Sequence, residues 1–131
     1  MPPPLNLVLE ALDKAIALVD SSCEYAEAFA RDLTKPPAEV MRELEMEAKR
    51  LVENGRQFTE LYINLTTEVQ KLDASHDPGA SVAHLALQTV ASFVLCIDIA
   101  IPDLYAKPLV PEMLDSTPLR KVRRLVSSKI K

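Results

Sequence analysis

Apolar residues recur in alternating steps of four and three over residues 5–33, and the pattern does not slip along the whole stretch. A repeat of this kind places one apolar stripe along a helix, because its average period of 3.5 residues is close to one helical turn. A second stripe follows in steps of three and four over residues 41–72. Two long helices, each with one apolar stripe, therefore constrain the rest of the fold.

Prolines set the ends of these helices. Pro36 and Pro37 cannot continue a helix, but proline is accepted at the start of one. The sequence predicts a helix over residues 4–33 and a second over residues 37–73, joined as an antiparallel hairpin. Gly55 lies on the second stripe and is expected to mark a close helix crossing or a kink. The other face of the second helix is charged and is expected to be solvated: Glu43, Glu45, Glu47, Lys49, Arg50 and Glu53.

A third helix, predicted over residues 78–101, is apolar on nearly all sides. Asp77 is expected to cap it, with Pro78 as its first residue. A helix of this kind is buried in a core or lies in a membrane, and about 20 residues suffice to span a bilayer. We expect a soluble, centrally buried helix, because polar residues disfavour the membrane alternative. The polar residues within the apolar stretch are His84, Gln88, Thr89, Ser92 and Asp98.

The last 30 residues differ in character from the rest. Four prolines predict an irregular segment over residues 102–118, with a short helical turn near residues 112–114. Residues 119–131 predict a short basic amphipathic helix. The formal net charge of the chain is −4, whereas residues 116–131 contain basic residues and no acidic ones. This tail is expected to dock on the acidic body, to stay solvated, or to contact an acidic partner, anionic lipid or nucleic-acid phosphate through Arg120, Lys121, Arg123 and Arg124.

The predicted fold is therefore all-α and of the helical-bundle type. It consists of a long antiparallel hairpin and a third apolar helix, followed by a proline-punctuated segment and a short basic helix. The division expected along the chain is a helical bundle domain over residues 1–101, an irregular segment over 102–118 and a basic tail over 119–131.

The sequence predicts no catalytic, cofactor-binding or metal-binding residues, and we expect that the chain is not an enzyme. Asp73 and His76 form a lone acid–histidine pair, whereas a metal site needs several ligands at fixed spacings. Cys23 and Cys96 lie at apolar positions, where burial is expected to make thiols inert. Asp98 is expected to lie in solvent at the end of its helix.

The apolar stripes are the residues that the sequence offers to a partner. One hairpin cannot cover a helix that is apolar all round, so the excess apolar surface demands a second copy, another subunit or lipid. We therefore expect a scaffold or adaptor subunit that binds other helical subunits in a hetero-oligomer. The predicted partner interface is Leu5, Leu9, Leu12, Ile16, Val19, Leu44, Leu51, Phe58, Tyr62, Leu65, Val69 and Leu72.

Two other functions fit the same pattern. One is a small subunit of a membrane complex, for example in an organelle, with residues 82–101 in the bilayer and the basic tail at the head groups. The other is a self-contained homo-oligomeric helical bundle. An intracellular location, in the nucleus or cytoplasm, is expected for the adaptor.

Residues 11–72 resemble the small head-module subunit 11 of the Mediator transcription coactivator complex. The resemblance begins at Ala11, Leu12 and Asp13, passes through apolar positions that end at Leu33, and closes with a second long helix that ends in residues 65–72. It implies a helical hairpin that pairs with a second small subunit in a four-helix bundle, and a role as a transcription coactivator subunit. The third helix and the basic end fit that family poorly. The apolar positions between the two ends of the first helix are Val19, Cys23, Ala26 and Phe29.

Overall fold

The computed structural model describes residues 4–104 and 111–130, and within these residues every regular element is helical. The four α-helices are α1 (Pro4–Asp32), α2 (Pro37–Ala74), α3 (Ala80–Ala100) and α4 (Thr117–Lys129). Two short 3₁₀ turns, η1 (Ile101–Asp103) and η2 (Pro111–Met113), lie between α3 and α4. The all-α fold is confirmed, and the predicted ends of the helices lie within two residues of the observed ones.

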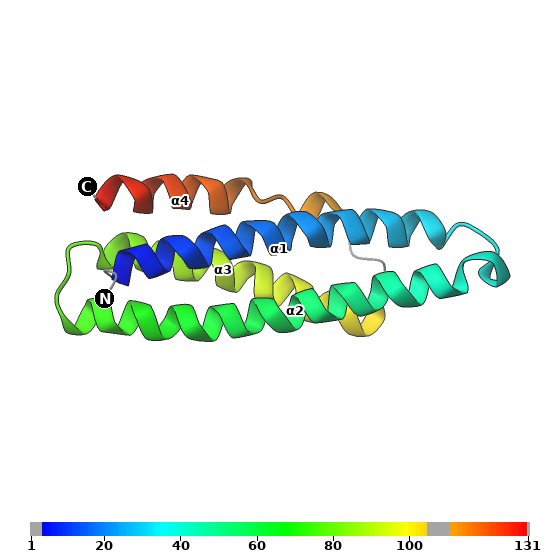
Figure 1. The fold of residues 1–131 in the computed structure, drawn as a ribbon, viewed down its shortest axis with the longest axis horizontal. Coiled ribbons are helices and arrows are strands. Elements are labelled where there is room, and N and C mark those ends of the chain that lie inside the picture. Colours follow the sequence, from blue (N-terminus) through cyan, green and yellow to red (C-terminus); the bar gives the residue numbers. More distant parts are fainter. Residues whose placement is uncertain (1–3, 105–110, 131) are drawn as a thin grey trace.

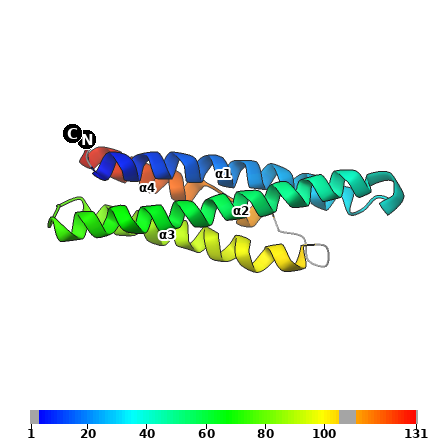
Figure 2. The ribbon, with the colours of Figure 1, turned by 60° about the horizontal axis from the view of Figure 1, so that its bottom comes forward.

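The helices form a bundle of four (Figure 1). α1 and α2 are an antiparallel hairpin, α3 packs against α2, and α4 packs against both α1 and α3. Figure 2 shows that the hairpin extends beyond α3 and α4 at the end where α1 turns into α2. The start of α1 and the end of α4 both lie at the opposite end of the bundle.

The buried line along α1 differs from the predicted stripe at alternate positions. Val8, Ala15 and Phe29 are fully buried, whereas Leu9 and Ala30, which lie on the predicted stripe of residues 5–33, are only half-buried. The reason is that α1 contacts α2, α3 and α4, so its buried face is wider than the seam of a two-helix contact.

The close crossing expected at Gly55 is confirmed. A Cβ atom at this position would lie 2.8 Å from Cδ1 of Ile101 and 3.1 Å from Cγ2 of Ile97. Glycine thus lets α2 approach the end of α3 closely, while α2 continues as one helix through this point. One turn further along α2, the rings of Phe58 and Phe93 pack with centroids 6.2 Å apart.

The expectation that α3 is centrally buried is wrong. Only one side of α3 packs into the core, through Ala83, Ala86, Val90, Phe93 and Ile97. The segment Ala80–Asp98 is long and apolar enough to cross a membrane, with a mean hydropathy of 1.8, and 28% of it is buried in the bundle. α3 therefore forms one corner of the bundle and exposes an outer face.

The basic segment is an integral part of the same bundle. Leu119, Val122 and Val126 of α4 are buried, and two arginines pair with carboxylates of α1. Arg120 lies 2.7 Å from Asp20, and Arg123 is bonded to Asp13. Because the paired residue numbers rise along α1 as they fall along α4, the two helices are antiparallel.

Two buried polar contacts lie between α1 and α2. Asn54 donates hydrogen bonds to the hydroxyls of Ser21 and Ser22 at 2.9 and 3.0 Å. Nearer the turn, Asp32 and Glu47 are 6% and 9% exposed. The prediction that Glu47 belongs to the solvated face is wrong, because this carboxyl faces α1 and shares a hydrogen bond with Asp32.

Candidate interaction surface

The residues predicted to bind a partner lie mainly inside this bundle. Ten of the twelve are buried, and the other two, Leu9 and Tyr62, are half-buried and packed against the core. They contact the helices of the same chain, because α3 and α4 cover the apolar side of the hairpin. A surface for a partner must be sought elsewhere on the described residues.

The tail residues predicted to bind a partner are divided between two directions. Arg120 and Arg123 pair with α1, as described above. Lys121 and Arg124 are exposed and point away from the core, together with Leu125, which is 47% exposed. The expected docking of the tail on the acidic body thus accounts for two of these four cationic side chains, Arg120 and Arg123.

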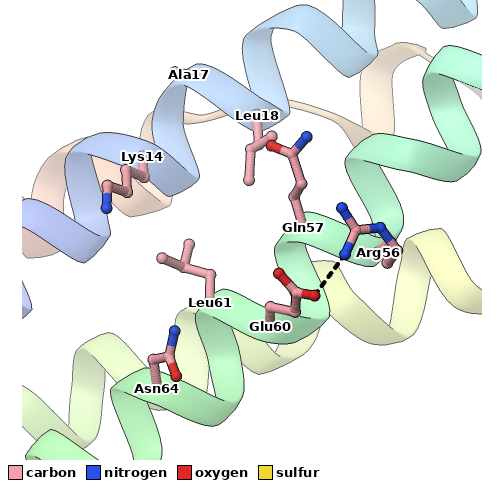
Figure 3. Close-up of a pocket in the computed structure, with 8 residues that line it drawn as sticks. All are labelled: Lys14, Ala17, Leu18, Arg56, Gln57, Glu60, Leu61 and Asn64. Atoms are coloured by element: carbon pink, nitrogen blue, oxygen red, sulfur yellow. Dashed lines mark hydrogen bonds and ion pairs between the residues drawn. The ribbon is translucent and has the colours of Figure 1, made fainter.

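A groove runs between α1 and α2 and is lined by these two helices alone (Figure 3). It consists of two adjoining hollows, of about 550 and 160 Å³, that share Lys14, Leu61 and Asn64. We call it the hairpin groove. Its apolar floor is formed by Leu7, Ala11, Ala17, Leu18, Leu61 and Leu65.

The rim of the hairpin groove carries both signs of charge. Arg56 contacts Glu53 at 2.6 Å and Glu60 at 2.5 Å. The hydrogen bond from Arg56 lowers the pKa of Glu53 to about 2, so this carboxyl is ionised under ordinary conditions. Lys14 makes no ion pair within the described part of the chain. The remaining rim residues are Glu10, Gln57, Asn64 and Glu68.

The hairpin groove does not lie along the strongest apolar stripe of either helix, so the sequence pattern did not predict it. A second, weaker stripe of apolar residues was present in α1, at Leu7, Ala11 and Leu18, beside the buried line. Ala11 in this stripe and the neighbouring Ala17 leave the space that a partner side chain would fill. On α2 the floor of the groove consists of Leu65, which lies on the predicted stripe, and Leu61, which lies one position away from it.

Another hollow, of about 510 Å³, lies between α1 and the segment of residues 112–116 that precedes α4, and it is strongly acidic. Cys23 stands in its wall as a half-buried thiol, not a fully buried one as expected. Burial and the neighbouring Glu27 carboxylate raise the pKa of Cys23, which disfavours the nucleophilic thiolate. The carboxylates around it are Asp20, Glu24, Glu27, Glu112 and Asp115.

The acid–histidine pair differs from the one considered in the sequence. The Asp73 carboxylate lies 2.8 Å from Nε2 of His84 in α3, so its histidine partner is His84 and not His76. This pair is about half exposed and joins α2 to α3. Residues 4–104 and 111–130 contain no group of three or more side chains placed to hold a metal ion. Asp98 is exposed, as expected.

Comparisons with known proteins give no match to a family model, a curated protein or a solved structure.

Proposed function

We propose that this chain is a non-catalytic helical adaptor subunit that binds one helix of a partner protein in the hairpin groove. The observation that carries the proposal is the combination of an apolar floor with a polar, charged rim on a face that no other described helix of the chain covers. This is the arrangement by which amphipathic helices are recognised in grooves. Burial of the apolar floor supplies affinity, and the rim selects the partner.

The dimensions of the groove define the partner. Its lining spans residues 7–18 of α1 and 56–68 of α2, which at 1.5 Å per residue is about 17 Å, or three helical turns. A matching helix carries apolar residues at i, i+3 or i+4, and i+7 on one face. Small side chains at Ala11 and Ala17 admit large anchors. An acidic residue of the partner is expected opposite Lys14.

A Mediator-like coactivator subunit is the most specific version of this proposal. In that family the hairpin is expected to pair with a second small subunit to complete a four-helix bundle. Here α3 and α4 occupy the apolar side of the hairpin. Under this version the partner subunit binds the hairpin groove on the outside of a bundle that is already complete, and the location is the nucleus.

A subunit of a membrane complex is the second candidate. It is favoured by the length and apolar composition of Ala80–Asp98. In this version α3 leaves the bundle or faces lipid with its outer side. The two candidates differ in whether detergent is needed to recover the protein with its partners.

The test is capture of tagged full-length protein from its native cells, with and without detergent, followed by mass spectrometry. Ala17, exposed on the groove, is replaced by Arg (A17R), and exposed Ala38 at the start of α2 is replaced by Arg (A38R) as the matched control. We expect soluble helical proteins that are recovered without detergent with wild type and A38R and lost with A17R. Recovery only in detergent, together with integral membrane proteins, would favour the second candidate. Equal recovery of these proteins with A17R would exclude the hairpin groove as their binding site.

A further inference from the structure

Exposed residues form a line along the outer face of α3, bordered by exposed His84 and Asp98. The line follows steps of four and three: Ser81, Leu85, Gln88, Ser92 and Leu95. These positions lie on one line of the helix, opposite the buried line through Ala83, Val90 and Ile97. Leu95 is 62% exposed and Leu85 41% exposed. No Asp, Glu, Lys or Arg occurs between Asp77 and Asp98, so this line is free of charged residues.

The absence of charge sets this face apart from the other three helices. α1 exposes Asp13, Asp20 and Glu24, α2 exposes a charged residue on nearly every turn, and α4 exposes Lys121 and Arg124. Two copies of a chain with a formal net charge of −4 repel each other where their acidic faces meet. Between Asp77 and Asp98, the α3 face is where two identical copies can approach without juxtaposing like charges.

The order of side chains along this face is complementary to itself. Read in the opposite direction, the line Ser81, Leu85, Gln88, Ser92, Leu95 becomes Leu, Ser, Gln, Leu, Ser. When two such helices lie antiparallel with Gln88 opposite Gln88, each leucine meets a serine of the other copy. Large side chains opposite small ones are what close helix packing requires.

We propose that α3 binds the α3 of a second copy of this chain in an antiparallel pair, with the two-fold axis at Gln88. The contact is isologous, as most homodimer contacts are. The two Gln88 amides bond to each other across the axis, since each has both a donor and an acceptor group. The Gln88 pair at the centre of the contact fixes the register, as a single buried Asn does in coiled coils.

Lipid suits this face less well than a second copy does. Bilayer lipid tails offer no partner to the Gln88 amide, which is costly in hydrocarbon, whereas the Ser92 hydroxyl already donates a hydrogen bond to the Thr89 carbonyl at 2.8 Å. A second copy satisfies the amide and receives both leucines. One helix against another covers less than the roughly 800 Å² per partner of a standard stable interface, so the dimer is expected to be reversible, with a Kd in the micromolar range.

Sedimentation velocity of the purified full chain over a range of concentrations tests the proposal. Leu95→Glu places a charge at both ends of the contact, while Leu125→Glu makes the same change at an exposed leucine of α4. We expect a concentration-dependent dimer for wild type and L125E, and at least tenfold weaker association for L95E, with unchanged helical circular dichroism in both variants. A wild-type chain that stays monomeric into the high micromolar range would overturn the proposal, as would an L95E variant that dimerises like wild type.

Disulfide trapping tests the antiparallel register. In a background with Cys23 and Cys96 replaced by Ser, Gln88→Cys is expected to form a covalent dimer under mild oxidation. Leu95→Cys is not, because the two copies of residue 95 lie about 20 Å apart in this register. Crosslinking at residue 95 without crosslinking at residue 88 would exclude the antiparallel register centred on Gln88. Binding of a monomeric chain to phosphatidylcholine vesicles, lost in L95E, would assign the face to lipid and overturn the proposal.

Discussion

Asn54 of α2 donates a hydrogen bond from Nδ2 to Oγ of Ser22 in α1, at 3.0 Å, and the Ser22 side chain is 1% exposed. The same amide reaches Ser21 at 2.9 Å. These contacts form a polar layer between two otherwise apolar stripes. Such a layer favours one register of the hairpin, because a shift of the helices would leave buried polar groups unpaired.

Asn54→Ala is therefore expected to lower the free energy of unfolding by about 1–2 kcal/mol, since it leaves the Ser22 hydroxyl without this donor. Asn64→Ala, at an exposed position of the same helix, serves as the control and should change stability by less than about 0.5 kcal/mol. Urea unfolding followed by circular dichroism measures both. Equal effects of the two variants would show that the polar layer does not contribute.

The Asp32–Glu47 pair predicts how stability depends on pH. Burial, together with the hydrogen bond to Asp32, raises the pKa of Glu47 from 4.5 to about 7. A raised pKa means that the folded state binds this proton more tightly than the unfolded chain does. The contribution of Glu47 is fully present below pH 4.5 and is lost as pH rises toward and through 7. The pKa of Asp32 is lowered, first by the hydrogen bond from Glu47, so its contribution changes only at more acidic pH.

Glu47→Gln mimics the protonated acid and should remove this pH dependence between pH 5 and 8. At pH 8 it is expected to stabilise the protein, by on the order of 2 kcal/mol. Thermal unfolding across this range, with exposed Glu45→Gln as the control, provides the measurement. A wild-type protein whose stability rises steadily from pH 5 to 8, with no effect of E47Q, would contradict this reading of the pair.

Helix α4 is expected to be held mainly by its apolar residues. Leu119 is fully buried, and Leu119→Ala should cost about 2–4 kcal/mol of stability. Arg120 and Arg123 form exposed ion pairs, so replacing both by Gln should cost about 1 kcal/mol or less, and less still at high salt. Chemical unfolding at low and high salt compares the variants. A larger loss from the double Arg variant than from L119A would be inconsistent with apolar docking.

The contact of Gly55 with α3 can be tested by a double-mutant cycle. Gly55→Ala gains about 1 kcal/mol of helix propensity but brings a Cβ atom to 2.8 Å from Cδ1 of Ile101. In an Ile101→Ala background the Cδ1 atom of Ile101 is absent, so Gly55→Ala should be more favourable there than in the wild type. Equal effects in both backgrounds would mean that Gly55 is not a contact point.

Much of the fold followed from local sequence signals. Prolines and stripe periodicity predicted α1 and α2, because a helix and its ends are determined by residues within one or two turns of each other. The choice of Val8 and Phe29 over Leu9 and Ala30 as buried residues did not follow, since it depends on how many helices surround α1. The pairing of Arg120 with Asp20 joins residues 100 positions apart, and no periodic pattern encodes it.

The candidate site was harder to predict than the fold. Glu47 was assigned to the solvated face because charged neighbours surround it in sequence, and only the packing of α1 reveals Asp32 beside it. The hairpin groove is defined by small residues such as Ala17, which carry little signal of their own. The apolar stripes predicted to bind a partner pack within the chain instead, because α3 and α4 cover them.

The central claim is that a partner helix lies in the hairpin groove. The most direct measurement is photo-crosslinking in native cells with a benzophenone amino acid placed at position 17, and at position 38 as the control. We predict one covalent adduct at position 17, with the crosslinked peptide of the partner carrying apolar residues at i, i+3 or i+4, and i+7. Adducts at position 38 but none at 17 would contradict the account.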